Sequence, residues 1–138
     1  RKLFDSQRLA VLATVSDRQP HCNIVAFVHS EDLRQLFFAT MRQSRKYQSL
    51  VSHPEVSMLV DSRGNVPSDL QQAVAVTIDG VARDLQEEKG AFIELYVSKH
   101  RSLIDFVSQP DCALVCLDVM RYKFVSRFQD VQVIELDR

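Results

Sequence analysis

The residues with the clearest potential for chemistry are Ser44, Arg45 and Lys46, which follow one another directly. Ser44 is a good N-cap residue, so the pattern predicts a short helix over residues 44–51 whose first turn carries a hydroxyl group and two cations. Free backbone N–H groups and the positive end of the helix dipole favour an anion at such a place. The guanidinium of Arg45 matches two phosphate oxygens, and the ammonium of Lys46 adds a compact charge. The segment is therefore a candidate phosphate site, to which Arg42 can contribute.

A simpler interpretation of the same residues stays open. Adjacent arginine and lysine residues are common on protein surfaces. In a first helical turn they oppose the dipole at a small cost unless an anion compensates. The segment alone does not decide between a solvated surface and a phosphate site.

The elements that must position this segment are mostly strands. The first strand, 9–15, is almost wholly apolar, which predicts burial on both of its faces. Gly80 predicts a bulge or a close approach of two backbones, and the last two strands are expected to form a hairpin that turns near Met120 and Arg121. Short turns between the first three strands favour an antiparallel meander, and the whole pattern predicts a barrel with two or three helical inserts. The predicted strands cover residues 9–15, 21–28, 36–40, 56–60, 73–82, 113–119 and 122–135, and the predicted helices cover 44–51, 86–99 and 103–107.

The composition narrows the class of protein. The chain has 138 residues, 46% hydrophobic and 25% charged, which fits one soluble globular domain over residues 1–138. Its 17 basic and 18 acidic residues give a net charge of -1, whereas nucleic-acid-binding proteins usually carry a large basic excess. No apolar run approaches the ~20 residues of a membrane-spanning helix. The first residue is Arg1 rather than methionine, which leaves a preceding targeting segment open.

No other group of residues predicts a reactive site. Cys112 and Cys116 share one face of a predicted strand, and a zinc site with His21 and Cys22 can be imagined, but the chain has no CxxC pair. Buried structural cysteines are the preferred interpretation, and no metal is expected. Three cysteines in a chain with a good core favour a reducing, cytoplasmic setting over disulfide bonds.

Six segments, in their order and spacing, resemble the pyridoxamine 5′-phosphate oxidase-related family. They are residues 7–14, 19–21, 36–40, 44–46, 53–60 and 78–82, and the resemblance extends from about Gln7 to Phe128. Members share a fold that binds flavin mononucleotide (FMN). The resemblance implies a mainly β (α+β) chain that forms a six-stranded antiparallel split β-barrel of Greek-key type with two or three short helices.

The resemblance also implies a cofactor site. Thr40, Ser44, Arg45 and Lys46 would hold the phosphate and ribityl chain, and the strand at 23–26 would line the isoalloxazine ring. Backbone groups there would pair with the polar edge of the ring, and Val25 or Ala26 would lie against its flat face. The loop at 61–69 would add two contacts, although its polar residues are equally well explained as turn formers. The implied cofactor-binding residues are Asn23, Ile24, Val25, Ala26, Ala39, Thr40, Ser44, Arg45, Lys46, Arg63 and Asn65.

One departure limits the resemblance. True oxidases of this family carry a tryptophan and an Arg-Leu-His-containing motif near the C-terminus, whereas this chain has no tryptophan and reads Tyr-Lys-Phe-Val-Ser-Arg-Phe-Gln over residues 122–129. The resemblance therefore does not extend to that substrate pocket, which argues against vitamin B6 oxidation.

The expected function is that of an FMN-dependent oxidoreductase acting with a small-molecule electron donor or acceptor. Family members are typically homodimers with two flavins at the subunit interface, so we expect a homodimer with no nucleic-acid or membrane partner. No residue is identifiable as a general acid or base. The alternatives are a non-catalytic flavin-binding or electron-transfer protein, and a split-barrel relative that uses coenzyme F420 or haem.

Overall fold

A computed structural model describes residues 1–127 and 129–137 of the chain. Its strands are β1 (Leu9–Ser16), β2 (Gln19–His29), β3 (Gln35–Met41), β4 (Glu55–Asp61), β5 (Val74–Asp84), β6 (Cys112–Ser126) and β7 (Asp130–Glu135). Its helices are α1 (Lys2–Ser6), α2 (Arg45–Ser52), α3 (Asp69–Gln72), α4 (Lys89–Lys99) and α5 (Ile104–Val107), with 3₁₀ turns η1 (Gln86–Glu88) and η2 (Arg101–Leu103).

Six of the strands close into a barrel. Their order is β3-β2-β1-β4-β5-β6, and β6 pairs back with β3. After α2, the chain returns so that β4 lies beside β1, which is a Greek-key arrangement. Every strand pair is antiparallel, and β7 extends the sheet outside the barrel as a partner of β6. The predicted six-stranded antiparallel barrel of Greek-key type is confirmed.

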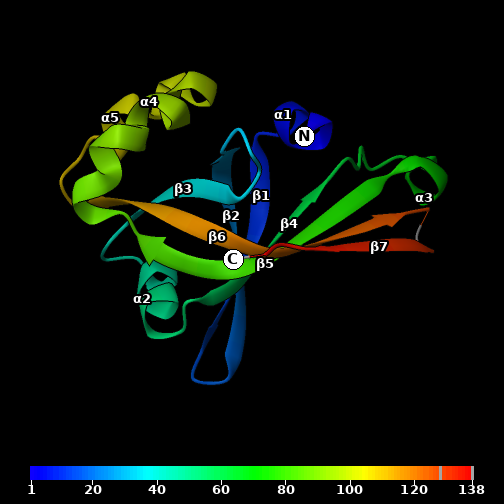
Figure 1. Cartoon of the computed structure of the whole chain (residues 1–138), viewed down its shortest axis with the longest axis horizontal. Helices are drawn as coiled ribbons and strands as arrows, with labels where there is room; N and C mark the ends of the chain where they lie inside the picture. Colours follow the sequence, from blue (N-terminus) through cyan, green and yellow to red (C-terminus); the bar gives the residue numbers. More distant parts are fainter. Residues whose placement is uncertain (128, 138) are drawn as a thin grey trace.

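The barrel interior is filled by alternate side chains of the strands. In β1, Ala10, Leu12 and Thr14 are buried, while Leu9 and Val15 remain exposed. The prediction that residues 9–15 are buried on both faces is wrong for the single chain. The reason is that α4 and α5 cover a different side of the barrel, so the outer side of β1 stays accessible (Figure 1).

A second core lies outside the barrel, between its wall and the helices that follow β5. Tyr96 of α4 and Val107 of α5 pack with Val28, Phe37 and other residues of β2, β3 and β6. The helix predicted over 86–99 is present, with η1 as its first turn. The cysteines expected to be structural, at 112 and 116, are buried with free thiols. Burial raises the pKa of the second thiol to about 12.

The hairpin predicted near Met120 and Arg121 is wrong. Strand β6 continues through both residues, because Met120 is accommodated as a bulge opposite the step from Asp79 to Gly80. The prediction for Gly80 is confirmed, since a Cβ atom at this position would lie 2.4 Å from the carbonyl oxygen of Asp118. The chain instead reverses between the end of β6 at Ser126 and the start of β7 at Asp130.

Candidate functional site

The segment between β3 and α2 is built around two hydroxyl groups. Ser44 is the N-cap of α2, and its Oγ accepts a hydrogen bond from the backbone N–H of Tyr47 at 3.2 Å. The same Oγ lies 2.9 Å from Oγ1 of Thr40, which is only 1% exposed. These contacts fix the first turn of α2 against the end of β3. We call residues 40–47 the α2 corner.

The two cations of the α2 corner are not neutralised within the described part of the chain. Arg45 is exposed and Lys46 is half-buried. No ion pair within residues 1–127 and 129–137 involves either side chain. Both charges therefore face the positive end of the helix dipole without a compensating carboxylate, which is an arrangement that favours a bound anion.

Arg42, in contrast to Arg45 and Lys46, has an ion-pair partner. Its Nε atom donates to Oδ2 of Asp84 at 3.0 Å, and its Nη1 atom donates to the carbonyl oxygen of Pro110 at 2.6 Å. Asp84 also accepts from the hydroxyl group of Tyr47 at 2.7 Å and from the backbone N–H of Gln86 at 2.9 Å. The expectation that Arg42 contributes to the phosphate site is wrong for this arrangement, because its guanidinium already has partners.

The charge state of this network follows from its hydrogen bonds. Burial alone would raise the pKa of the Asp84 carboxyl, but the donors on Arg42, Tyr47 and Gln86 outweigh it and lower that pKa. The hydrogen bond to Asp84 in turn raises the pKa of Arg42. The pair is therefore fully charged at neutral pH.

The predicted cofactor residues of β2 point in different directions. Ile24 is 69% exposed on the outside of the barrel, whereas Val25 is part of the barrel core and offers no side-chain surface to a ligand. Asn23 and Ala26 are half-buried, and the carbonyl oxygen of Ala26 accepts a hydrogen bond from the Tyr96 hydroxyl at 2.9 Å. Ala39 of β3 packs against the second core, under α4.

An apolar surface follows the outside of β2, β1 and β4. Val11 of β1 lies opposite both Ile24 of β2 and Leu59 of β4, so the three side chains form one row. Leu9, which is 56% exposed, belongs to the next row, opposite Ala26. We call these five residues the outer face.

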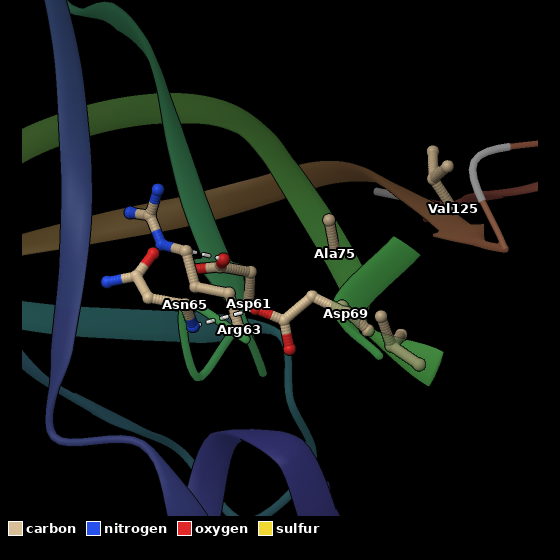
Figure 2. A pocket seen from close by; sticks show the side chains of 8 residues that line it. Asp61, Arg63, Asn65, Asp69, Ala75 and Val125 are labelled. Atoms are coloured by element: carbon tan, nitrogen blue, oxygen red, sulfur yellow. Dashed lines mark hydrogen bonds and ion pairs between the residues drawn. The ribbon is translucent and has the colours of Figure 1, made fainter. Parts of the chain in front are cut away.

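The loop that follows β4 (residues 61–69) lines a cavity of about 290 Å³ at the C-terminal end of the strand. Figure 2 shows the side chains of Arg63 and Asn65 extending to one side of the loop, with Asp61 beside them. Arg63 Nε donates to Asp61 Oδ2 at 2.9 Å. The apolar wall includes Ala75 and Val125, from β5 and β6. The structure thus brings together both cofactor residues predicted in this loop.

The loop itself is folded by Asp69. Its carboxylate accepts hydrogen bonds from the backbone N–H groups of Gly64, Asn65 and Val66, at distances from 2.7 to 3.2 Å. These bonds lower the pKa of Asp69, and the bond from Gly64 has the largest effect. Asn65 has a positive φ of 60°, which asparagine tolerates better than most residues. The turn-forming interpretation therefore describes the backbone of this loop, while the side chain of Arg63 lines the cavity.

The α2 corner and this cavity are far apart in one chain. Ala75, which lines the cavity, and Asp84, which binds Arg42 and Tyr47 of the α2 corner, lie near the two ends of β5, nine positions and therefore about 30 Å apart. Figure 1 shows α2 and α3 at different ends of the molecule. The predicted cofactor residues of the α2 corner and those of the loop therefore form two separate groups in one chain, and the predicted residues of β2 and Ala39 belong to neither group.

The sequence of the chain matches the family model described as pyridoxamine 5′-phosphate oxidase over residues 1–135. The chain belongs to this family. No curated protein matches it.

Solved structures share the fold of this family member at low sequence identity. A haem-binding protein from Mycobacterium smegmatis has a TM-score of 0.83 and 15% identity, over 98% of this chain and 58% of that protein. This chain thus spans little more than half of that relative. General Stress Protein 26 from Bacillus anthracis has a TM-score of 0.70 and 22% identity, over 98% and 94% of the two chains. An FAD-binding protein from Mesorhizobium loti has a TM-score of 0.71 and 18% identity, over 89% and 88%.

The region where the chain departs from the true oxidases has a structural role here. Tyr122 is buried in the barrel, and its hydroxyl donates to the carbonyl oxygen of Leu33 at 2.6 Å. Phe124 packs against the same core. Residues 122–126 are thus the end of a barrel strand, and Phe128 of the same region lies outside the described residues.

The sequence did not predict the roles of Asp84 and Tyr47, which form a hydrogen-bonded network with Arg42 at the α2 corner. The two residues are 37 positions apart, and Asp84 is 42 positions from Arg42. No local pattern signals such a pairing, which exists only because the barrel brings the end of β5 next to α2. Among the described residues, no group of three or more potential metal ligands is present, and no helix is long and apolar enough to span a membrane.

Proposed function

We propose that this chain binds FMN between two copies of itself, with the phosphate in the α2 corner, and acts as an FMN-dependent oxidoreductase. The observation that carries the proposal is the pair of cations Arg45 and Lys46, in the first turn of α2, without a carboxylate partner among the described residues. A phosphate monoester supplies the missing negative charge and accepts hydrogen bonds from the free N–H groups of that turn.

The outer face supports the homodimer. A run of apolar residues in β1 and β2 that is exposed in the single chain is typical of a surface covered by a partner. The covering partner that we propose is a second copy, because a two-fold axis places the same apolar patch on both sides of the contact.

A second copy also resolves the separation of the two groups of predicted residues. The α2 corner and the Arg63–Asn65 loop lie at opposite ends of β4, which itself contributes Leu59 to the outer face. In an antiparallel dimer, the loop of one copy approaches the α2 corner of its partner. We propose that each FMN takes its phosphate contacts from one copy and the contacts of Arg63 and Asn65 from the other.

Bound FMN supplies the hydride or electron chemistry of the reaction. The residues of this chain bind and orient the cofactor: Arg45 and Lys46 through the phosphate, and the backbone of residues 23–26 along the ring. The partner excludes water from the pocket. No side chain of this chain is assigned a proton-transfer role.

The phosphate contact is tested by replacing Arg45 and Lys46 together with alanine. Two charge-assisted hydrogen bonds of roughly 1.5–3 kcal/mol each predict FMN binding weaker by ~10²- to 10⁴-fold. Riboflavin, which lacks the phosphate, loses little affinity. A Lys2→Ala, Arg101→Ala variant removes the same charge from exposed positions elsewhere and serves as the control. Equal losses for FMN and riboflavin would contradict the proposal.

The oxidoreductase activity needs its own test. Anaerobic titration of the FMN-loaded protein with NADH or NADPH, followed by addition of candidate acceptors, measures reduction and reoxidation of the flavin by its absorbance. Reduction by a nicotinamide and turnover with an acceptor support an enzyme. A flavin that is inert to every donor supports a flavin store or electron-transfer protein instead.

A haem protein is the second candidate, because the M. smegmatis haem-binding protein has a TM-score of 0.83 to this chain. Both ring nitrogens of His29 are hydrogen-bonded, to Ser30 and Asp5, and His100 is buried with its Nε2 bonded to the carbonyl oxygen of Phe27. His21 and His53 are therefore the histidines available as axial ligands. An intense Soret band in the purified protein that is lost in His21→Ala or His53→Ala would favour haem. The mass of the released ligand also separates FMN from F420.

A further inference from the structure

We propose that Asp84 is a positioning residue that gives the α2 corner its preference for FMN over riboflavin. This inference rests on the proposed function, because it concerns how the phosphate contact is shaped. Asp84 lies at the end of β5, and its side chain is 7% exposed. It does not itself face the phosphate, since its oxygens are occupied by donors of this chain.

One carboxylate holds both sides of the cation-bearing segment. On one side, Arg42 binds Asp84 through Nε at 3.0 Å and Nη2 at 3.4 Å. On the other side, the hydroxyl of Tyr47 binds the same carboxylate at 2.7 Å. Ser44, Arg45 and Lys46 lie between these two anchored residues. The path of the backbone across the phosphate site is therefore set by a group on a different strand.

Further contacts make this anchor rigid. The backbone N–H of Arg42 donates to the carbonyl oxygen of Asp111 at 2.9 Å, and its carbonyl oxygen accepts from Gln48 Nε2 at 3.0 Å. Asp84 is itself fixed by the N–H of Gln86. A binding site whose donors are held in place before the ligand arrives loses less entropy on binding.

The network also decides which cations meet the phosphate. Asp84 neutralises Arg42 and holds its guanidinium at the end of β5. Arg45 and Lys46 keep their charges for the ligand. Asp84 thus keeps the charge of Arg42 from binding the phosphate and orients the segment that carries Arg45 and Lys46.

The test compares the dissociation constants of FMN and riboflavin for the full chain and three variants, measured by flavin fluorescence. Asp84→Asn keeps the size of the side chain but removes its charge. We expect the preference for FMN to fall by about 10- to 100-fold, the factor that corresponds to one charge-assisted hydrogen bond, with riboflavin affinity nearly unchanged. Tyr47→Phe removes one of the two anchors and keeps the ion pair, so we expect a smaller fall in the same ratio.

Asp118→Asn is the matched control. Asp118 of β6 accepts a hydrogen bond from Nε of Arg83, the β5 residue next to Asp84, at 2.8 Å. Its hydrogen-bond partners among the described residues do not include any residue of the α2 corner. We expect this variant to keep the wild-type ratio. A ratio that is unchanged or increased in Asp84→Asn, or lowered equally in Asp118→Asn, overturns the inference. If Asp84→Asn does not fold, Tyr47→Phe decides, and an unchanged ratio there overturns it too. A wild-type protein without any preference for FMN contradicts the proposed function itself.

Discussion

The α2 corner and the loop at 61–69 are each organised by one aspartate, but in different ways. Asp84 is buried and binds side chains 37 and 42 positions away in the sequence. Asp69 binds backbone N–H groups three to five positions away, in a loop that is mostly exposed. The first arrangement exists only when the barrel is closed, whereas the second is a local turn that needs no distant partner.

This difference shows which of the two regions is held rigid by contacts with distant parts of the chain. A phosphate contact depends on donors held at fixed positions, and the α2 corner obtains this from tertiary structure. Beyond Ser62, which is hydrogen-bonded to Val74 of β5, the loop keeps its shape mainly through the local bonds of Asp69, so this part can open while the barrel stays folded. We therefore expect substitutions at the two aspartates to differ in their effects on global stability.

The largest expected effect comes from Gly80→Ala, which acts on both regions. Gly80 lies within β5, the strand that begins beside the cavity and ends at Asp84. A Cβ atom there would meet backbone at 2.4 Å, so we expect a loss of about 3 kcal/mol in the free energy of unfolding. Urea denaturation measures it. Gly90→Ala is the control, because a Cβ atom at that position would meet nothing within 4 Å, and its effect should be neutral or stabilising. Similar destabilisation of both variants would contradict this account.

Asp84→Ala is expected to be the next most damaging change. It leaves the half-buried Arg42 and Tyr47 without their shared partner, and we expect a loss of about 2–3 kcal/mol in the free energy of unfolding. The more exposed pair of Arg83 and Asp118 provides the comparison, and Asp118→Ala should cost less than about 1 kcal/mol. If both variants lose the same stability in urea, the α2 corner has no special anchor.

Acid should weaken the same anchor. The pKa of Asp84 is lowered in the folded protein, so the unfolded state binds more protons between that value and the ordinary aspartate pKa of about 3.9. Stability from Asp84 is therefore complete above this window and is lost as the pH falls through it. The difference in urea midpoint between wild type and Asp84→Asn should be constant from pH 7 to 5 and should shrink below pH 4. A difference that stays constant down to pH 3 would argue that the charge of Asp84 is unimportant.

Asp69→Ala should have the smallest effect on the whole protein. Its partners are the backbone N–H groups of residues 64–66, so the loss is confined to the loop. We expect faster hydrogen exchange at these amides and an almost unchanged urea midpoint. A shift in midpoint comparable to that of Asp84→Ala would mean that the loop belongs to the cooperative core.

The parts of the structure that the sequence predicts well are those with local or periodic signals. The alternating strands, the Ser44 cap and the bulge at Gly80 belong to this group. The hairpin near Met120 is predicted wrongly because a bulge allows one strand to continue through a break in its alternation. The partners of Arg42 are not predictable, since they depend on which strand ends the barrel brings together.

Closure of the barrel by β3 and β6 has a consequence for how copies of this chain can associate. Each barrel strand is paired along at least part of both edges, whereas β7 has one edge with no partner strand among the described residues. It exposes Val131, Val133 and Ile134 between acidic ends. If two such edges joined in full antiparallel overlap, Asp130 of each would lie opposite Glu135 of the other. The like charges disfavour this edge-to-edge pairing of two copies at neutral pH.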